Sequence, residues 1–151
     1  MAHDQLVATI SVDLEPQQAF ERFLALESWW PRAYSWSGEA LVDLSIDPRA
    51  GGLLTETGPH GFRCDFGRVL AIEPPRHLLL SWQISPRREP QPDPAQASEV
   101  ELSFAAAAAG TSVTLAHRHF RRHGPGHEQY REAMAAEQGW PYLLRCFAGR
   151  I

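Results

Sequence analysis

The most suggestive chemistry in this sequence lies where histidines cluster, between residues 117 and 127. His117 and His119 are two residues apart in a strand-like segment, so both imidazoles are expected on one face. Such a pair could bind a metal ion or act as a general base. A third ligand is missing nearby, and a glycine-rich turn at 124–126 separates His123 from His127. The spacing therefore predicts no metal site, and His117 remains a candidate polar contact for a small molecule.

Arg68 is the main candidate for a charged contact inside the fold. It belongs to the same alternating set as Phe66, Leu70 and Ile72, and if that face is inward its guanidinium points at the interior. A buried charge needs a partner, which Glu56 or a carboxylate or phenolate on a ligand could supply through paired hydrogen bonds. The alternative is a solvent-facing arginine at a bulge or a strand end.

Tyr130 falls in the expected terminal helix, where its hydroxyl could orient a polar group of a ligand. With His117 or Arg68 it could also form an acid/base pair, since proton transfer needs a donor and an acceptor within about 3 Å. No spacing requires such a pair, no serine or cysteine sits in a recognisable nucleophile motif, and Gly51-Gly52 reads as a turn. The sequence therefore names no catalytic residue and no cofactor, and it favours a binding protein over an enzyme.

Five tryptophans in 151 residues provide large apolar surfaces. Trp30, Trp82 and Trp140 are the candidates for the walls of a cavity, because they occupy a helix end, an inner strand position and the terminal helix. Plain core packing is the alternative for each of them.

The elements that would position these residues begin with a strand at 6–12. A helix should start at Glu15-Pro16, because proline in the first turn loses no hydrogen bond, and it should end at the pair Trp29-Trp30. Segments of alternating polarity follow, separated by glycine and proline turns. The expected strands are 41–47, 53–57, 62–73, 77–85, 99–105 and 111–120.

Two further segments complete the predicted architecture. Residues 85–98 are polar and proline-rich, which predicts an exposed loop; a hairpin tip is favoured there over a lid. Residues 127–147 read as a long terminal helix with one apolar face. Pro141 removes a backbone hydrogen bond and clashes with the preceding turn, so a break is expected near 138–141.

Composition limits the class of protein. A chain of 151 residues fits one domain with one core. Eighteen acidic and fourteen basic residues give a net charge of -4, which argues against nucleic acid as a partner. No stretch approaches the roughly 20 apolar residues of a membrane span, and the first residues lack a secretory pattern. Cys64 and Cys146 are far apart in the sequence, so reduced thiols and a cytoplasmic location are expected.

Taken together, the ordered pattern resembles the activator of heat-shock-protein-90 ATPase homologue-like family, within the START-like (SRPBCC) superfamily. The resemblance spans nearly the whole chain and depends on the order and spacing of its pieces. The residues that carry it are Pro16 and Phe20, Trp29-Trp30, Gly51-Gly52 with Glu56, Gly67-Arg68-Val69, Glu73-Pro74-Pro75, Leu80-Ser81-Trp82, Ser98-Glu99-Val100, Gly110-Thr111, His117 and Gly139-Trp140.

The resemblance implies a single START-like domain over residues 1–151, of the α+β class with a helix-grip fold. In that fold a curved antiparallel sheet of six or seven strands wraps around a long C-terminal helix, with one or two short helices after the first strand. A cavity lies between sheet and helix. Relatives bind lipids, polyketides, hormones or other apolar molecules, and cyclase or aromatase relatives work largely by shaping the cavity.

The leading hypothesis is therefore a protein that binds a small hydrophobic or amphipathic molecule in such a cavity. Its walls would be Trp30, Trp82 and Trp140, and its polar contacts would be Arg68, His117 and Tyr130. One alternative is a module that touches a chaperone through its outer surface. Another is a cavity-type enzyme, a cyclase, dehydratase or hydrolase. The oligomeric state, including a homodimer, is left open.

Overall fold

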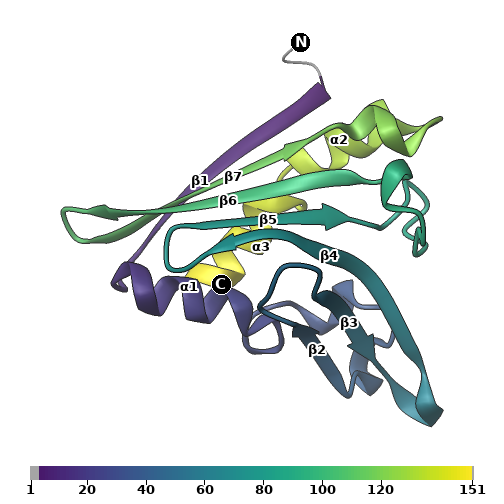
Figure 1. Ribbon diagram of the computed structural model, residues 1–151, viewed down its shortest axis with the longest axis horizontal. Coiled ribbons are helices and arrows are strands. Elements are labelled where there is room, and N and C mark those ends of the chain that lie inside the picture. The colour runs from purple at the N-terminus through teal and green to yellow at the C-terminus, as the bar shows by residue number, and fades with distance from the viewer. Residues whose placement is uncertain (1–3, 151) are drawn as a thin grey trace.

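The protein is described by a computed structural model that covers residues 4–150 (Figure 1). Its strands and helices follow in the order β1 (Gln5–Val12), α1 (Pro16–Leu24), β2 (Asp43–Ile46), β3 (Leu53–Thr57), β4 (Arg63–Glu73), β5 (His77–Trp82), β6 (Ser98–Ala107), β7 (Gly110–Arg118), α2 (His127–Ala135) and α3 (Trp140–Ala148). Short 3₁₀ helices occupy Leu26–Ser28, Arg32–Tyr34, Gly38–Ala40, Pro59–Gly61, Pro94–Gln96 and Phe120–His123.

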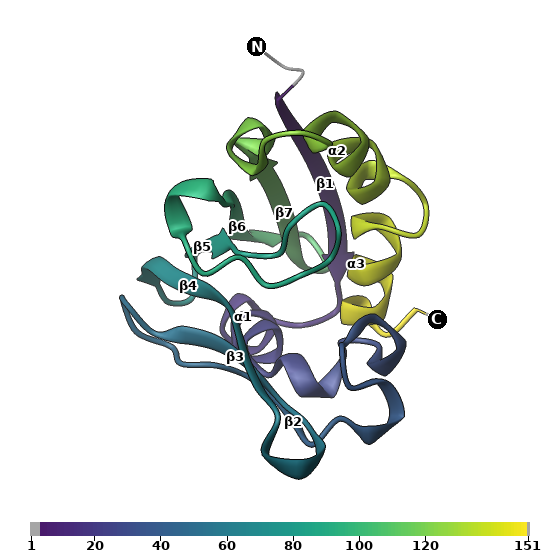
Figure 2. The same cartoon turned by 90° about the vertical axis from the view of Figure 1, so that its right-hand side faces the viewer.

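The strands form one seven-stranded antiparallel sheet in the order β1-β7-β6-β5-β4-β3-β2. Consecutive strands from β2 to β7 pair with their neighbours, and β1 closes the other edge against β7. Figure 2 shows α2 and α3 on the same side of the curved sheet, so the sheet wraps around the helical layer. The predicted helix-grip fold is confirmed.

Helix α1 is shorter than expected. Pro16 occupies its first turn, and Ala19, Phe20 and Phe23 form its buried face against β6 and β7. The helix ends at Leu24 rather than at the tryptophan pair. The chain continues as a 3₁₀ turn, in which the Trp29 indole Nε1 donates a hydrogen bond to the Phe23 carbonyl at 3.3 Å. This turn brings Trp30 to the concave face of the sheet, where its ring lies 6.2 Å from that of Trp82.

The terminal helical region is broken, as its sequence predicts. Helix α2 ends at Ala135 and α3 begins at Trp140, with Pro141 in the first turn of α3. The break depends on Gly139, because a Cβ atom there would lie only 2.3 Å from the Met134 carbonyl oxygen. No side chain fits so close to a backbone atom, so glycine lets the two helices meet at this angle.

Candidate ligand-binding site

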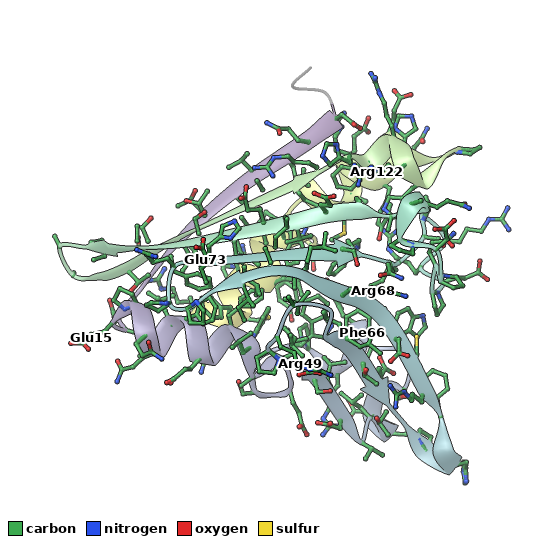
Figure 3. The ribbon with its side chains drawn as sticks, in the orientation of Figure 1. Glu15, Arg49, Phe66, Arg68, Glu73 and Arg122 are labelled. Atoms are coloured by element: carbon green, nitrogen blue, oxygen red, sulfur yellow. The ribbon has the colours of Figure 1, made fainter. Side chains whose placement is uncertain are left out.

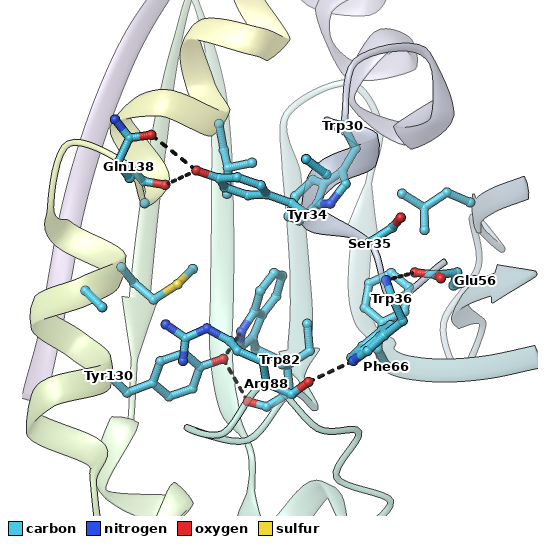
Figure 4. Close-up of a pocket in the computed structure, with 17 residues that line it drawn as sticks. Trp30, Tyr34, Ser35, Trp36, Glu56, Phe66, Trp82, Arg88, Tyr130 and Gln138 are labelled. Carbon is cyan, nitrogen blue, oxygen red and sulfur yellow. Dashed lines mark hydrogen bonds between the residues drawn. The ribbon is translucent and has the colours of Figure 1, made fainter. Parts of the chain in front are cut away.

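A cavity of about 470 Å³ lies between the concave face of the sheet and the helices (Figure 4). Strands β3, β4 and β5 supply one wall, α2 and the start of α3 supply another, and residues 30–36 close a third side. The lining side chains are Trp30, Ala33, Tyr34, Ser35, Trp36, Leu44, Glu56, Phe66, Trp82, Ile84, Arg88, Tyr130, Ala133, Met134, Gln138 and Leu143, together with Gly139.

The inner wall is aromatic and held by hydrogen bonds. The Trp82 indole Nε1 donates to the Tyr130 hydroxyl at 2.8 Å, and that hydroxyl donates to the Ile84 carbonyl at 2.8 Å. Burial raises the pKa of Tyr130 well above its usual range, so the hydroxyl keeps its proton. These two bonds fix the orientation of Trp82, whose ring also packs 6.2 Å from Trp30. The wall is therefore a set of rigid ring faces.

Two irregular segments meet at the mouth of the cavity. The Trp36 indole Nε1 donates to the backbone carbonyl of Arg88 at 2.7 Å, which links residues 31–42 to the loop at 83–97. The Arg88 guanidinium lies over the Tyr130 ring, 4.5 Å from its centroid. On the opposite side, the Tyr34 hydroxyl donates to the Gln138 carbonyl at 2.8 Å. The loop at 83–97 thus contributes to the site instead of projecting freely as a hairpin tip (Figure 4).

A carboxylate, that of Glu56, also belongs to the cavity wall. Its side chain points inward from β3, as does that of Leu54, and only 1% of Glu56 is exposed. One carboxylate oxygen accepts a hydrogen bond from the Trp36 backbone N–H at 3.1 Å, and the other accepts from the Ser37 N–H at 2.7 Å. The sequence presents Glu56 as a possible partner for Arg68 and as part of the family pattern, and does not single it out as a residue of the cavity wall. The available signal was its inward position in an alternating strand.

The structure brings three of the six residues named from the sequence together in this cavity. Trp30, Trp82 and Tyr130 all line it. Trp140 is buried directly behind them, with its ring 5.3 Å from that of Trp82, and it is outside the lining. It supports the wall without forming part of its surface.

His117 is fully buried in the core and does not reach the cavity. The Trp140 indole Nε1 donates to its Nδ1 at 2.9 Å, and its Nε2 lies 2.7 Å from the Ser98 hydroxyl. Because an indole N–H can only donate, Nδ1 accepts and the ring proton resides on Nε2. Burial holds the pKa of His117 well below its usual range. His117 therefore acts in this arrangement as a neutral link between Trp140 and β6.

His119 does not share a face with His117, contrary to the sequence-based expectation. Strand β7 ends at Arg118, and His119 has a left-handed backbone with φ of 64°. This conformation turns the chain into the 3₁₀ helix Phe120–His123 and breaks the alternation.

Arg68 is exposed on the outer face of the sheet, away from this cavity. The expected alternation fails because β4 contains a bulge: Leu54 pairs with Gly67, but the next residue of β3, Thr55, pairs with Asp65. Phe66 is the extra residue, so residues 67–69 exchange faces, and Val69 rather than Arg68 is buried. A second register shift, between Val69 and Ala71, restores the alternation, and Ile72 packs against the core. Phe66 and Arg68 lie on the same strand in Figure 3.

In the part of the chain that the structure describes, the remaining reactive groups form no metal site, and the buried thiol of Cys64 is not activated. Within residues 4–150 no group of three histidine, cysteine, aspartate or glutamate side chains could hold a metal ion. Burial, with a smaller effect of the nearby Glu56 charge, raises the pKa of the Cys64 thiol to about 11. A thiol with such a pKa is a poor nucleophile near neutral pH. In these same residues no helix is both long and apolar enough to cross a membrane.

A family model described as Activator of Hsp90 ATPase homolog 1-like protein matches residues 17–150. The chain belongs to this family. Its members share the START-like (SRPBCC) helix-grip fold seen here and commonly bind hydrophobic ligands. The predicted family is therefore confirmed, and the cavity of this chain lies between the sheet and the helices of that fold. Comparison with curated proteins finds no sequence match.

Solved structures resemble the whole chain. The protein Txn09, an anthrahydroquino-γ-pyrone synthase solved as a complex, is 28% identical, with complete coverage of both chains and a TM-score of 0.69. Protein MLL2253 from Mesorhizobium loti is 18% identical, covering 97% of this chain and 95% of its own, with a TM-score of 0.68. Protein NE0264 from Nitrosomonas europaea is 16% identical, covering 99% and 95%, with a TM-score of 0.69. The latter two support the fold alone.

Proposed function

We propose that this protein binds a small hydrophobic or amphipathic molecule with a planar aromatic body in the cavity between the sheet and the helices. The observation that carries the proposal is the volume of about 470 Å³ enclosed mainly by aromatic and aliphatic side chains. Ligand sites of small molecules typically measure about 300–1,000 Å³ and combine apolar walls with a few polar groups. The same proposal treats residues 1–151 as a single START-like domain, because the sheet and the helices share one hydrophobic core.

The ring faces of the wall favour planar ligands over flexible chains. Trp82 is fixed by its bond to Tyr130, and Trp30 and Phe66 line the same space. Aromatic rings attract one another in offset or edge-to-face arrangements, and a wall that is already rigid loses little entropy when a flat molecule enters.

The comparisons support the same class of ligand. The family commonly binds hydrophobic molecules, and Txn09 is named for a product class with fused aromatic rings. Its full-length similarity also favours a second candidate function, in which this chain converts such a molecule instead of only carrying it. Mass spectrometry of a polycyclic aromatic polyketide incubated with the protein separates the two, since a carrier returns its ligand unchanged. The chaperone alternative rests on the family description and stays a prediction.

Calorimetric titration with a hydroxyanthraquinone, compared with a saturated fatty acid, tests the binding proposal. We expect saturable binding of the aromatic probe, and loss of that binding in Ala133→Trp, which places a large ring at the mouth of the cavity. Ala135→Trp is the matched control, because the same change on the same helix lies outside the lining. Absence of saturable binding, or equal binding by both variants, would contradict the proposal.

A further inference from the structure

Glu56 is an unusual residue for the wall of an apolar cavity. It is 1% exposed, and among residues 4–150 no salt bridge involves its carboxylate. Its cross-strand neighbours are Leu44 and Cys64, both buried. A buried charge in such surroundings is costly unless hydrogen bonds satisfy it.

The described partners satisfy only part of this carboxylate. Each of its oxygens accepts one backbone N–H, from Trp36 at 3.1 Å and from Ser37 at 2.7 Å. An ionised carboxylate offers about four acceptor positions, so about half of its capacity remains available. Because Glu56 belongs to the cavity lining, a ligand in the cavity can reach this group (Figure 4).

We propose that Glu56 is the recognition group for a hydrogen-bond donor on the ligand, which makes the ligand class an aromatic molecule bearing a phenolic hydroxyl or an ammonium group. This inference rests on the proposed function and adds to it the polar end of the ligand. The donor meets Glu56, while the ring body lies against Phe66 and Trp82. Low local polarity strengthens a bond of this kind, and a charged acceptor strengthens it further.

The same carboxylate also sets the orientation of the ligand. An anionic group is repelled from Glu56, whereas Arg88 offers a guanidinium at the mouth, over the Tyr130 ring. Any acidic group of the ligand is therefore expected at the mouth, and the donor is expected inside.

The two bonds to Trp36 and Ser37 give Glu56 a structural role as well, because they hold the irregular segment that closes the cavity. The two roles make different predictions. Anchoring that segment affects every ligand alike, whereas donor recognition changes the preference between two ligands of the same size that differ only in a donor.

The test compares three probes by calorimetry: 2-naphthol, 2-methylnaphthalene, and 2-naphthylmethylamine as its ammonium ion. In Glu56→Gln we expect the affinity for 2-naphthol, relative to 2-methylnaphthalene, to fall about tenfold from the wild-type ratio. If Glu56 recognises a cationic donor, the substitution should lower the affinity for the ammonium probe more than the affinity for 2-naphthol. If it recognises a phenolic donor, the affinity for 2-naphthol should fall more. Asp65→Asn is the matched control, since it removes an exposed carboxylate from the neighbouring strand β4 and should keep the wild-type ratio.

A second measurement uses only the wild-type protein, in case Glu56→Gln does not fold. Difference infrared spectra should show a shifted carboxylate band with 2-naphthol and no shift with 2-methylnaphthalene. If all probes bind but the ratio is the same in Glu56→Gln, or the band does not move, donor recognition is overturned and the proposed function stands. If no probe binds, both are overturned.

Discussion

Tyr130 holds the cavity wall in place through two hydrogen bonds of its hydroxyl. Tyr130→Phe removes the hydroxyl that accepts from Trp82 and donates to Ile84, and so leaves a buried indole N–H and a buried carbonyl unpaired. We expect the free energy of unfolding to fall by about 1–3 kcal/mol, as measured by urea denaturation. Tyr142→Phe, at a less buried ring on α3, should change it by less than about 0.5 kcal/mol. Equal effects of the two substitutions would show that the bonds of Tyr130 contribute nothing specific.

The buried histidines make stability depend on pH in a defined direction. Burial holds the pKa of His117 well below its usual range, and burial together with the nearby His127 lowers that of His123 to about 4. In the unfolded chain these two imidazoles take up protons below about pH 6.5, whereas in the folded protein they remain neutral until the pH is much lower. The unfolded state then binds more protons, so the free energy of unfolding falls as the pH drops from about 6.5 toward 4.

Replacing one ring isolates its share of this pH dependence. His117→Gln keeps an acceptor for Trp140 and a donor for Ser98, and it should reduce the slope of unfolding free energy against pH by up to about 1.4 kcal/mol per pH unit between pH 6.5 and 5. His60→Asn is the control, because it removes an exposed imidazole and asparagine tolerates the positive φ of 57° there. A slope unchanged in His117→Gln, as determined by denaturation at several pH values, would rule out His117 as a source.

Among the elements, the two irregular segments at the mouth should control the rate of ligand exchange. Trp36→Phe keeps a ring that can pack against Phe66 but removes the N–H that bonds to the Arg88 carbonyl. We expect the ligand dissociation rate to rise about five- to tenfold, since one hydrogen bond contributes roughly 1 kcal/mol. Stopped-flow displacement of a bound hydroxyanthraquinone measures this rate. Arg87→Ala, at an exposed neighbour outside the lining, should leave the rate unaltered.

The junction of α2 and α3 is a second element with a measurable requirement. In Gly139→Ala the new methyl group would lie 2.3 Å from the Met134 carbonyl oxygen, so the helices must move apart. A loss of about 2–3 kcal/mol in unfolding free energy is expected. Gly149→Ala, where φ is 72° and the space is open, isolates the backbone strain and should cost about 1 kcal/mol. Comparable losses by thermal denaturation would mean that the close approach at Gly139 is relieved without moving the helices.

At the scale of the whole molecule, local patterns predict the elements well and the site only in part. Strand alternation identifies each strand, and Pro141 correctly marks the break between α2 and α3. The face of the sheet on which Arg68 lies could not be predicted from the sequence of its own strand, because the bulge at Phe66 depends on how β4 pairs with β3. That pairing is a property of two strands together, and strict alternation assumes that it is regular.

The mouth of the cavity is harder to predict for a related reason. Trp36 and Arg88 lie in segments without periodicity, and their contact joins residues 52 positions apart in the sequence. Nor does any local rule indicate that Glu56 supports the backbone at Ser37, because the bond exists only once the segment has folded across β3. Composition and spacing can nominate such residues, but tertiary packing decides which of them share a cavity.

Because the cavity walls come from the sheet, from α2 and α3 and from residues 30–36, a bound ligand should stabilise the whole molecule rather than one segment. At a ligand concentration 100 times the dissociation constant, the free energy of unfolding is expected to rise by about 2.7 kcal/mol. Hydrogen exchange followed by mass spectrometry should then show slower exchange in β5 and α3 as well as at the mouth. Ala133→Trp, whose new ring should block the mouth of the cavity, should show neither effect. Protection confined to the loop at 83–97 would instead indicate a ligand on the surface, since binding there does not change the rate at which the core unfolds and exchanges its amide hydrogens.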